Sequence, residues 1–150
     1  GQNYGAGRYD RIRTGIRDAI LISWIWSVIV IAAVYLAAPV LIRLISGATT
    51  PEVIQTARWY LRFDTPFYFV LGILIVLRNA MQGLGRKVVP MVSSSIELAG
   101  KLIVAWVLAD RMGYFGIIIS EPATWILCTI LLCMTFFSDK RIRKQEIRRE

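Results

Sequence analysis

The chain has 150 residues, of which 56% are hydrophobic and 19% are charged, with a formal net charge of +8 and no histidine. The apolar residues form long blocks rather than amphipathic stripes, so the composition excludes an ordinary soluble domain. Four blocks reach or approach the roughly 20 residues that a helix needs to cross a hydrocarbon core, and they are too long for barrel strands of about 10 residues. We therefore predict an all-α, polytopic helical membrane protein.

The predicted elements are a cytoplasmic loop at residues 1–18, membrane helices at about 19–46, 52–83, 88–109 and 113–138, and a basic cytoplasmic tail at 139–150. The early glycines favour a tight loop, and the charged run after them suits an amphipathic helix at the headgroups. Because the chain opens on Gly1 rather than Met, we expect a fragment of a longer protein.

The distribution of basic residues predicts the orientation in the membrane. If the four helices alternate from a cytoplasmic N-terminus, most of the Lys and Arg residues fall in the cytoplasm. Only Arg43, Arg58, Arg62 and Arg111 fall on the far side, and Lys101 lies within the membrane. This positive-inside bias predicts that both ends are cytoplasmic. It also explains the net charge, so nucleic-acid binding is not expected.

The second predicted helix has a polar first half that contains Arg58, Arg62 and Asp64. We place this half in the outer headgroup region, with Pro66 marking the entry into the membrane. Asp64 is then either an acid of an external vestibule or, more simply, one member of a surface ion pair with a nearby arginine.

The third predicted helix carries Glu97 and Lys101 in the middle of an apolar block. Ionisable residues at bilayer depth are costly, so they usually face a bundle interior or an aqueous cavity. Residues four apart share one helix face, and the acid precedes the base, which is the better order for an ion pair. Ser93 and Ser94 lie on or near the same face. This helix therefore needs neighbouring helices to cover its polar stripe.

The fourth predicted helix contains Glu121 immediately before Pro122. A proline frees backbone carbonyls that can help to hold a cation, so this acid is a candidate cavity residue; the simpler alternative is a protonated Glu121 bonded to a neighbouring helix. Glu97 and Glu121 would lie roughly 18 Å and 12 Å from the external turn, at 1.5 Å per residue. Small residues at Gly116 and Ser120 should let helix backbones approach closely.

No pattern in the sequence indicates catalysis, a metal site or a cofactor. Cys128 and Cys133 have no histidine partner and no CxxC spacing, so a metal or redox site is not expected. The sequence instead points to an ion or substrate cavity, whose candidate residues are Glu97, Lys101, Glu121 and Asp64. A carboxylate can bind a proton, bind a cation or pair with a positive side chain, and ion-coupled transport requires side chains that change between such roles.

Short motifs follow one another along nearly the whole chain. They are Gln2, Asn3, Gly5 and Gly7 in the first loop, Arg78, Gln82, Gly83 and Gly85 around the second connector, and then Pro90-Met91, Ser95, Glu97-Leu98, Gly113–Gly116, Glu121-Pro122 and Trp125. Jointly they resemble the multidrug and toxic compound extrusion (MATE) transporters, which have twelve membrane helices in two six-helix lobes. The resemblance implies that the four helices are the last four of the C-terminal lobe, and that the N-terminal lobe is a partner.

The same resemblance implies efflux of organic cations or amphipathic drugs from the cell (plasma or inner) membrane, driven by Na⁺ or proton entry through alternating access. Some members use an acid midway along their tenth helix, but that position falls near Leu71 or Gly72 here. Coupling is then expected to rest on Glu97 and Glu121, on other helices, or on the N-terminal lobe. The alternatives are a lipid-linked saccharide flippase, which should carry more cavity cations than Lys101, and a non-transporting membrane scaffold.

Overall fold

The computed structural model describes residues 1–47 and 49–138, and every regular element in these ranges is helical. The elements are α1 (Gln2–Gly5), α2 (Tyr9–Ser46), α3 (Pro51–Asp64), the 3₁₀ turn η1 (Thr65–Phe67), α4 (Tyr68–Gly83), α5 (Val88–Met112) and α6 (Tyr114–Phe137). The prediction of an all-α fold is confirmed. The predicted tail at 139–150 lies outside the described residues.

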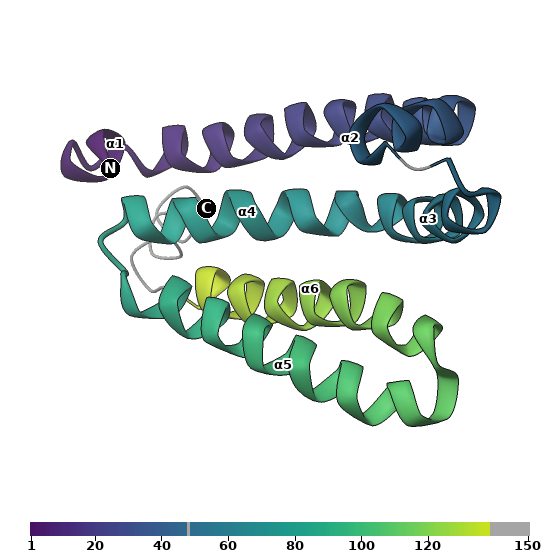
Figure 1. Cartoon of the computed structure of the whole chain (residues 1–150). Helices are drawn as coiled ribbons and strands as arrows, with labels where there is room; N and C mark the ends of the chain where they lie inside the picture. Colours follow the sequence, from purple (N-terminus) through teal and green to yellow (C-terminus); the bar gives the residue numbers. More distant parts are fainter. Residues whose placement is uncertain (48, 139–150) are drawn as a thin grey trace.

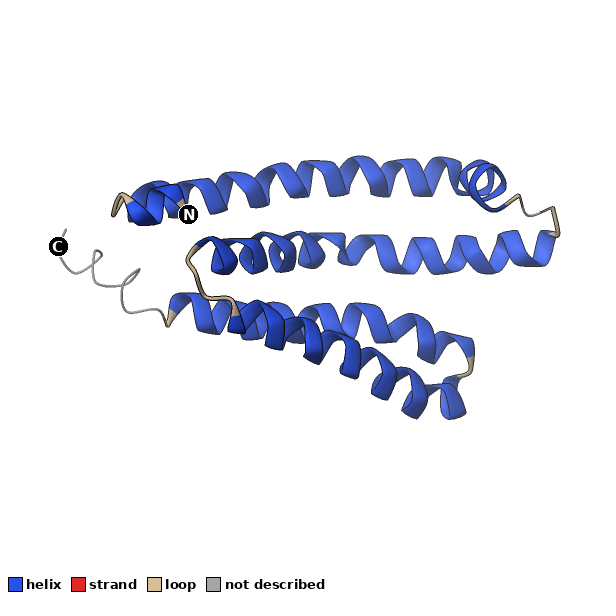
Figure 2. Cartoon of the chain, turned by 60° about the vertical axis from the view of Figure 1, so that its left-hand side comes forward, coloured by secondary structure: helices blue, strands red, loops and turns tan. Residues whose placement is uncertain are grey.

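The helices lie in three layers (Figure 1). One layer is α1 with α2, the middle layer is α3 with α4, and the third is the antiparallel hairpin of α5 and α6. We call the end with the α2–α3 and α5–α6 connections the turn end, and the end with α1 and the α4–α5 connection the loop end. Figure 2 shows the same order of layers from another direction.

In the described ranges, four helical segments are long and apolar enough to cross a membrane. They are Tyr9–Ser46, Pro51–Gly83, Val88–Met112 and Tyr114–Phe137. Many large apolar side chains on these helices face outward, such as Leu36 at 86% exposure and Trp106 at 76%. A hydrocarbon environment satisfies such side chains, so the fold is that of a multi-pass membrane protein.

Two helices extend beyond the predicted membrane spans. The charged run from Tyr9, expected as an amphipathic helix at the headgroups, is continuous with the first span, and Asp10 lies favourably in the first turn of α2. The third predicted helix does not stop at Ala109 but continues to Met112. Gly113 alone separates α5 from α6, and its φ of 58° is a conformation that glycine adopts without strain.

The predicted helix at 52–83 begins at Pro51 and is interrupted once, by η1. Pro66 lies in this 3₁₀ turn, and its missing backbone N–H removes one bond of the helical ladder. The interruption separates the polar α3 from the apolar α4.

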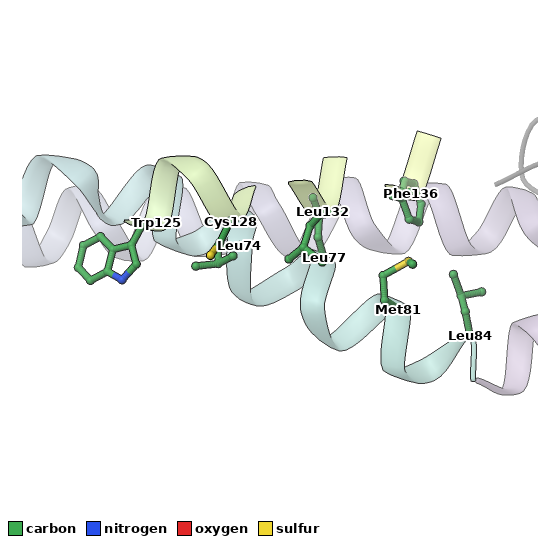
Figure 3. Close-up of a cluster of buried hydrophobic side chains, with 8 residues drawn as sticks. All are labelled: Leu74, Leu77, Met81, Leu84, Trp125, Cys128, Leu132 and Phe136. Atoms are coloured by element: carbon green, nitrogen blue, oxygen red, sulfur yellow. The ribbon is translucent and has the colours of Figure 1, made fainter. Parts of the chain in front are cut away.

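The apolar core lies between α4 and α6 (Figure 3). Its buried members are Leu74, Leu77, Met81 and Leu84 on one side and Trp125, Cys128, Leu132 and Phe136 on the other. The α4 members recur at three- and four-residue intervals, and so do those of α6, which is the spacing of one helix face. This contact fixes the two helices parallel to each other and brings the residues on their flanks into register.

Close backbone approach holds α5 against α6. A Cβ atom added at Gly116 would lie 2.5 Å from the backbone oxygen of Leu108, and one added at Gly100 would lie 2.8 Å from Cγ2 of Thr124. The expectation that small residues allow this approach is confirmed at Gly116.

We expect Gly116→Ala to lower the stability of the protein by about 1–3 kcal/mol, as overpacking does where the opposing atom belongs to the backbone. Gly15→Ala is the matched control, because its helix is open around Gly15 with no atom within 4 Å of the added Cβ. Thermal unfolding of the purified protein in detergent should show a lower melting temperature for Gly116→Ala only. Equal melting temperatures for the two variants would contradict this account of the α5–α6 contact.

Candidate functional site

A chain of alternating, half-buried charges links three helices at one edge of the bundle. Arg78 Nη2 of α4 lies 2.7 Å from Glu97 Oε2 of α5, and Glu97 Oε1 lies 3.3 Å from Lys101 Nζ on the same helix. Lys101 Nζ also lies 3.4 Å from Glu121 Oε1 of α6. The structure therefore brings together three of the four predicted cavity residues, Glu97, Lys101 and Glu121, and it adds Arg78.

Neutral polar groups extend this chain at both ends. Arg78 Nη2 donates to the hydroxyl of Ser93, which is fully buried, at 3.3 Å. Towards the turn end, the Tyr60 hydroxyl of α3 donates to Glu121 Oε2 at 3.0 Å. The chain therefore connects α4, α5, α6 and α3 by direct contacts.

The polar stripe of α5 explains why these groups meet. Ser93, Glu97 and Lys101 recur every four residues, so they share one face, while Leu98 and Leu102 on another face are exposed. The predicted neighbour Ser94 is exposed and takes no part in the chain. Lys101 also lies 5.7 Å from the ring centroid of Trp125, which gives its ammonium group an aromatic face as well as two carboxylates.

Asp64 is the fourth predicted residue, and its surroundings differ from the simpler expectation. It is only 2% exposed, and among the described residues it forms no ion pair with Arg58 or Arg62. The expected surface ion pair is therefore wrong. Asp64 lies where α3 gives way to η1, and it is close enough to Glu121 and Lys101 to interact with both electrostatically.

Two oxygen atoms beside this helix interruption lack partners. Asp64 Oδ1 and the hydroxyl of Thr65 are buried without a hydrogen bond. A buried ionised carboxylate is very unfavourable when nothing compensates its charge. Asp64, Glu97 and Glu121 outnumber Arg78 and Lys101, so this interior group is electrically neutral only when it holds one proton or one further cation.

Sequence reasoning missed two members of the group. The positive-inside count places Arg78, which lies near the second connector, on the cytoplasmic side. Its guanidinium group instead reaches Glu97 of α5. Its place a little more than one turn before the end of α4 was an available signal. Tyr60 gave no signal, because its role depends on the contact between α3 and α6.

Most of the predicted motif residues lie at the loop end and shape the backbone. Gly7 and Gly85 have φ values of 65° and 77°, which favour glycine. The backbone around Gly1 packs against Gly83, where an added Cβ would lie 3.3 Å from the Gly1 nitrogen.

The other motif residues also serve the backbone at this end. The carbonyl groups of Gln2 and Asn3 accept bonds from the amides of Ala6 and Arg8, and that of Gln82 accepts one from Gly85. Gly5 donates to the carbonyl of Gly1. Among the predicted motif residues, Arg78, Glu97 and Glu121 belong to the chain of charges.

The oxygen atoms near the helix interruption determine which ions this region can hold. In the described part of the chain, no three His, Cys, Asp or Glu side chains are grouped so that they could hold a metal ion. The unpartnered oxygens of Asp64 and Thr65 and the carboxylate of Glu121 are hard oxygen donors, which suit an alkali cation or a proton. The rings of Tyr60, Tyr68 and Trp125 lie among them; the Tyr68 and Trp125 centroids are 6.1 Å apart.

Comparison with known proteins identifies one family model, MatE, which matches residues 1–107. The matched stretch runs from α1 through most of α5, so it includes Arg78, Glu97 and Lys101. No curated protein and no solved structure matches the chain.

The interior ion pairs should be energetically coupled. We expect Arg78→Gln and Glu97→Gln each to destabilise the protein by about 1–3 kcal/mol, because each leaves a charged partner with fewer bonds. The double variant should be destabilised by less than the sum of the two single effects. We expect the difference from that sum to exceed about 0.5 kcal/mol. Thermal or denaturant unfolding in detergent measures these differences. The exposed Ser94→Ala is the control on the same helix, and strictly additive effects would exclude the pairing.

Proposed function

The chain belongs to the MatE family, whose members are membrane transporters rather than enzymes, and from this premise we propose that it forms part of an ion-coupled antiporter. The transporter exports cationic or amphipathic organic compounds by alternating access and uses Na⁺ or protons as the coupling ion. It works in the cell membrane, with both ends of this chain in the cytoplasm.

The observation that carries this proposal is the uncompensated carboxylate of Asp64. Its buried Oδ1 has no partner, and the neighbouring charges leave one negative charge in excess. A coupling ion or proton bound there neutralises the interior. An organic cation satisfies the same charge and gains contact with the ring of Tyr68. The two cations therefore compete for one negative charge, which is the condition for exchange.

The helix interruption at η1 supplies a mechanical counterpart. Helix interruptions are typical of transporter ion sites, because the unwound backbone adds ligands and permits movement. Asp64 and Thr65 lie directly at this interruption. We propose that neutralisation of Asp64 changes the angle between α3 and α4 and so favours one of the two access states.

A second lobe completes the cavity. Only 6% of the residues in the most apolar stretch of α5 are buried, and its charged stripe faces α4 and α6 at one edge of the bundle. The family resemblance implies a twelve-helix transporter, and we propose that its N-terminal lobe lies across this edge, so that substrate passes between the lobes.

The two alternatives fit these contacts less well. A lipid-linked saccharide flippase needs interior cations for phosphate groups, but Lys101 and Arg78 are both engaged by carboxylates. In a membrane scaffold, charged residues are needed only as structural ion pairs. Glu97 forms such pairs, but Asp64 does not.

Drug susceptibility of cells that express the protein in its full-length form tests the proposal. We expect Asp64→Asn to abolish resistance at unchanged protein abundance, because the neutral side chain no longer exchanges a cation. Glu121→Gln should weaken resistance as well, since it removes the second carboxylate of the same region. The exposed Asp110→Asn is the control, and resistance should survive it.

The same variants distinguish the antiporter from the membrane scaffold. Transport into vesicles under an imposed Na⁺ or pH gradient identifies the coupling ion, and the Asp64→Asn variant should respond to neither gradient. If Asp64→Asn and Glu121→Gln lower only the amount of protein, the scaffold reading gains and the antiporter reading fails. If resistance is unchanged in both, the ion site lies elsewhere.

A further inference from the structure

A half-open groove of about 440 Å³ lies between α2 and α3 near the turn end, apart from the interior charges. Its lining residues are Tyr35, Gln55, Arg58, Trp59, Arg62 and Phe63. Its volume is within the range of small-molecule sites. The lining contains two arginines and three aromatic residues but no acid. Its net charge is therefore positive, whereas the group around Asp64 and Glu121 has an excess of negative charge.

The Arg62 side chain is held in place by Tyr35. Arg62 Nη2 donates to the Tyr35 carbonyl at 2.8 Å, the Tyr35 hydroxyl donates to the Arg62 carbonyl at 3.0 Å, and the guanidinium carbon lies 5.3 Å from the ring centroid. This arrangement fixes one guanidinium group at the groove before any ligand arrives.

The two arginines retain unused donors. The Nε atoms of Arg58 and Arg62 are buried without a hydrogen-bond partner, and neither side chain has a carboxylate within ion-pair distance among the described residues. Buried N–H groups normally find acceptors. Two guanidinium groups one helical turn apart suit an anion with several oxygens, above all a phosphate. They repel the organic cations of the proposed transport reaction.

The groove lies at headgroup depth. The segment Pro51–Gly83 has 33 residues, which is about 50 Å of helix against a hydrocarbon core of about 30 Å. Its polar first third therefore extends into the interface. Trp59 is 65% exposed and Tyr35 is 45% exposed, as is typical of aromatic residues at a membrane surface.

We infer that this groove binds the headgroup of an anionic phospholipid from the leaflet at the turn end. The phosphate lies between the guanidinium groups of Arg58 and Arg62, and the glycerol and upper acyl chain lie against Trp59 and Phe63. The site goes beyond the proposed transport function and does not depend on it.

Native mass spectrometry of the purified full-length protein tests this inference, with dioleoyl phosphatidylglycerol and dioleoyl phosphatidylcholine as probes. We expect the wild type to retain phosphatidylglycerol about tenfold more strongly, and the double variant Arg58→Gln/Arg62→Gln to lose that preference. Arg43→Gln/Arg111→Gln is the control, because it removes the same charge from exposed arginines outside the groove lining. A folded state is checked by circular dichroism for each variant.

Two further measurements sharpen the result. Trp59→Phe should remove most of the change in tryptophan fluorescence caused by a short-chain phosphatidylglycerol. Inorganic phosphate at millimolar concentration should not displace the lipid, since the acyl contacts are missing. Loss of the preference in the control variant, its persistence in the groove variant, or displacement by phosphate alone would each overturn the inference.

Discussion

The compensation of charge at membrane depth is the constraint on which this structure depends. An isolated Glu97 or Lys101 would be very unfavourable in hydrocarbon, so α5 can lie in the membrane only beside helices that supply opposite charges. Arg78 of α4 and Glu121 of α6 supply them, at 2.7 Å and 3.4 Å. The apolar core between α4 and α6 stabilises the same arrangement, but the hydrophobic effect is not directional and does not fix how the helices are rotated. The ion pairs therefore orient α5 towards α4 and α6, and the apolar contacts hold α4 and α6 together.

Close packing and charge pairing depend on each other in the α5–α6 hairpin. Gly100 and Gly116 bring the two backbones together, which places Lys101 within reach of Glu121. A wider separation would leave the ammonium group with Glu97 alone and the Glu121 carboxylate with only the Tyr60 hydroxyl. The excess negative charge of the interior would then be shared differently. The small residues of the hairpin thus have an electrostatic as well as a steric role.

The sequence was sufficient for the fold class and the number of spans, because apolar blocks of this length have few other solutions. It also predicted that Glu97, Lys101 and Glu121 need partners on neighbouring helices, and each of them forms an ion pair. The rotation of α3 was not predictable, because its polar residues occur on several faces. Asp64 was therefore expected at the surface and is buried. Arg78 and Tyr60 were missed for a related reason: their roles arise from contacts between helices, which helical periodicity within one segment does not specify.

The distribution of charge divides the molecule into regions suited to ligands of opposite sign. The alternating chain from Arg78 to Glu121 contains two positive and two negative groups. Asp64, at its edge, supplies the excess negative charge, and the groove at Arg58 and Arg62 lies on the other side of the same helix segment with an excess of positive charge. In the proposed transporter, a cation that binds between Asp64 and Glu121 therefore changes the charge beside the helix interruption. The hydrogen bonds between Arg62 and Tyr35 hold α3 against α2, and the apolar core holds α4 against α6. The interruption at η1 is then the point between two anchored segments at which binding of a cation can produce movement.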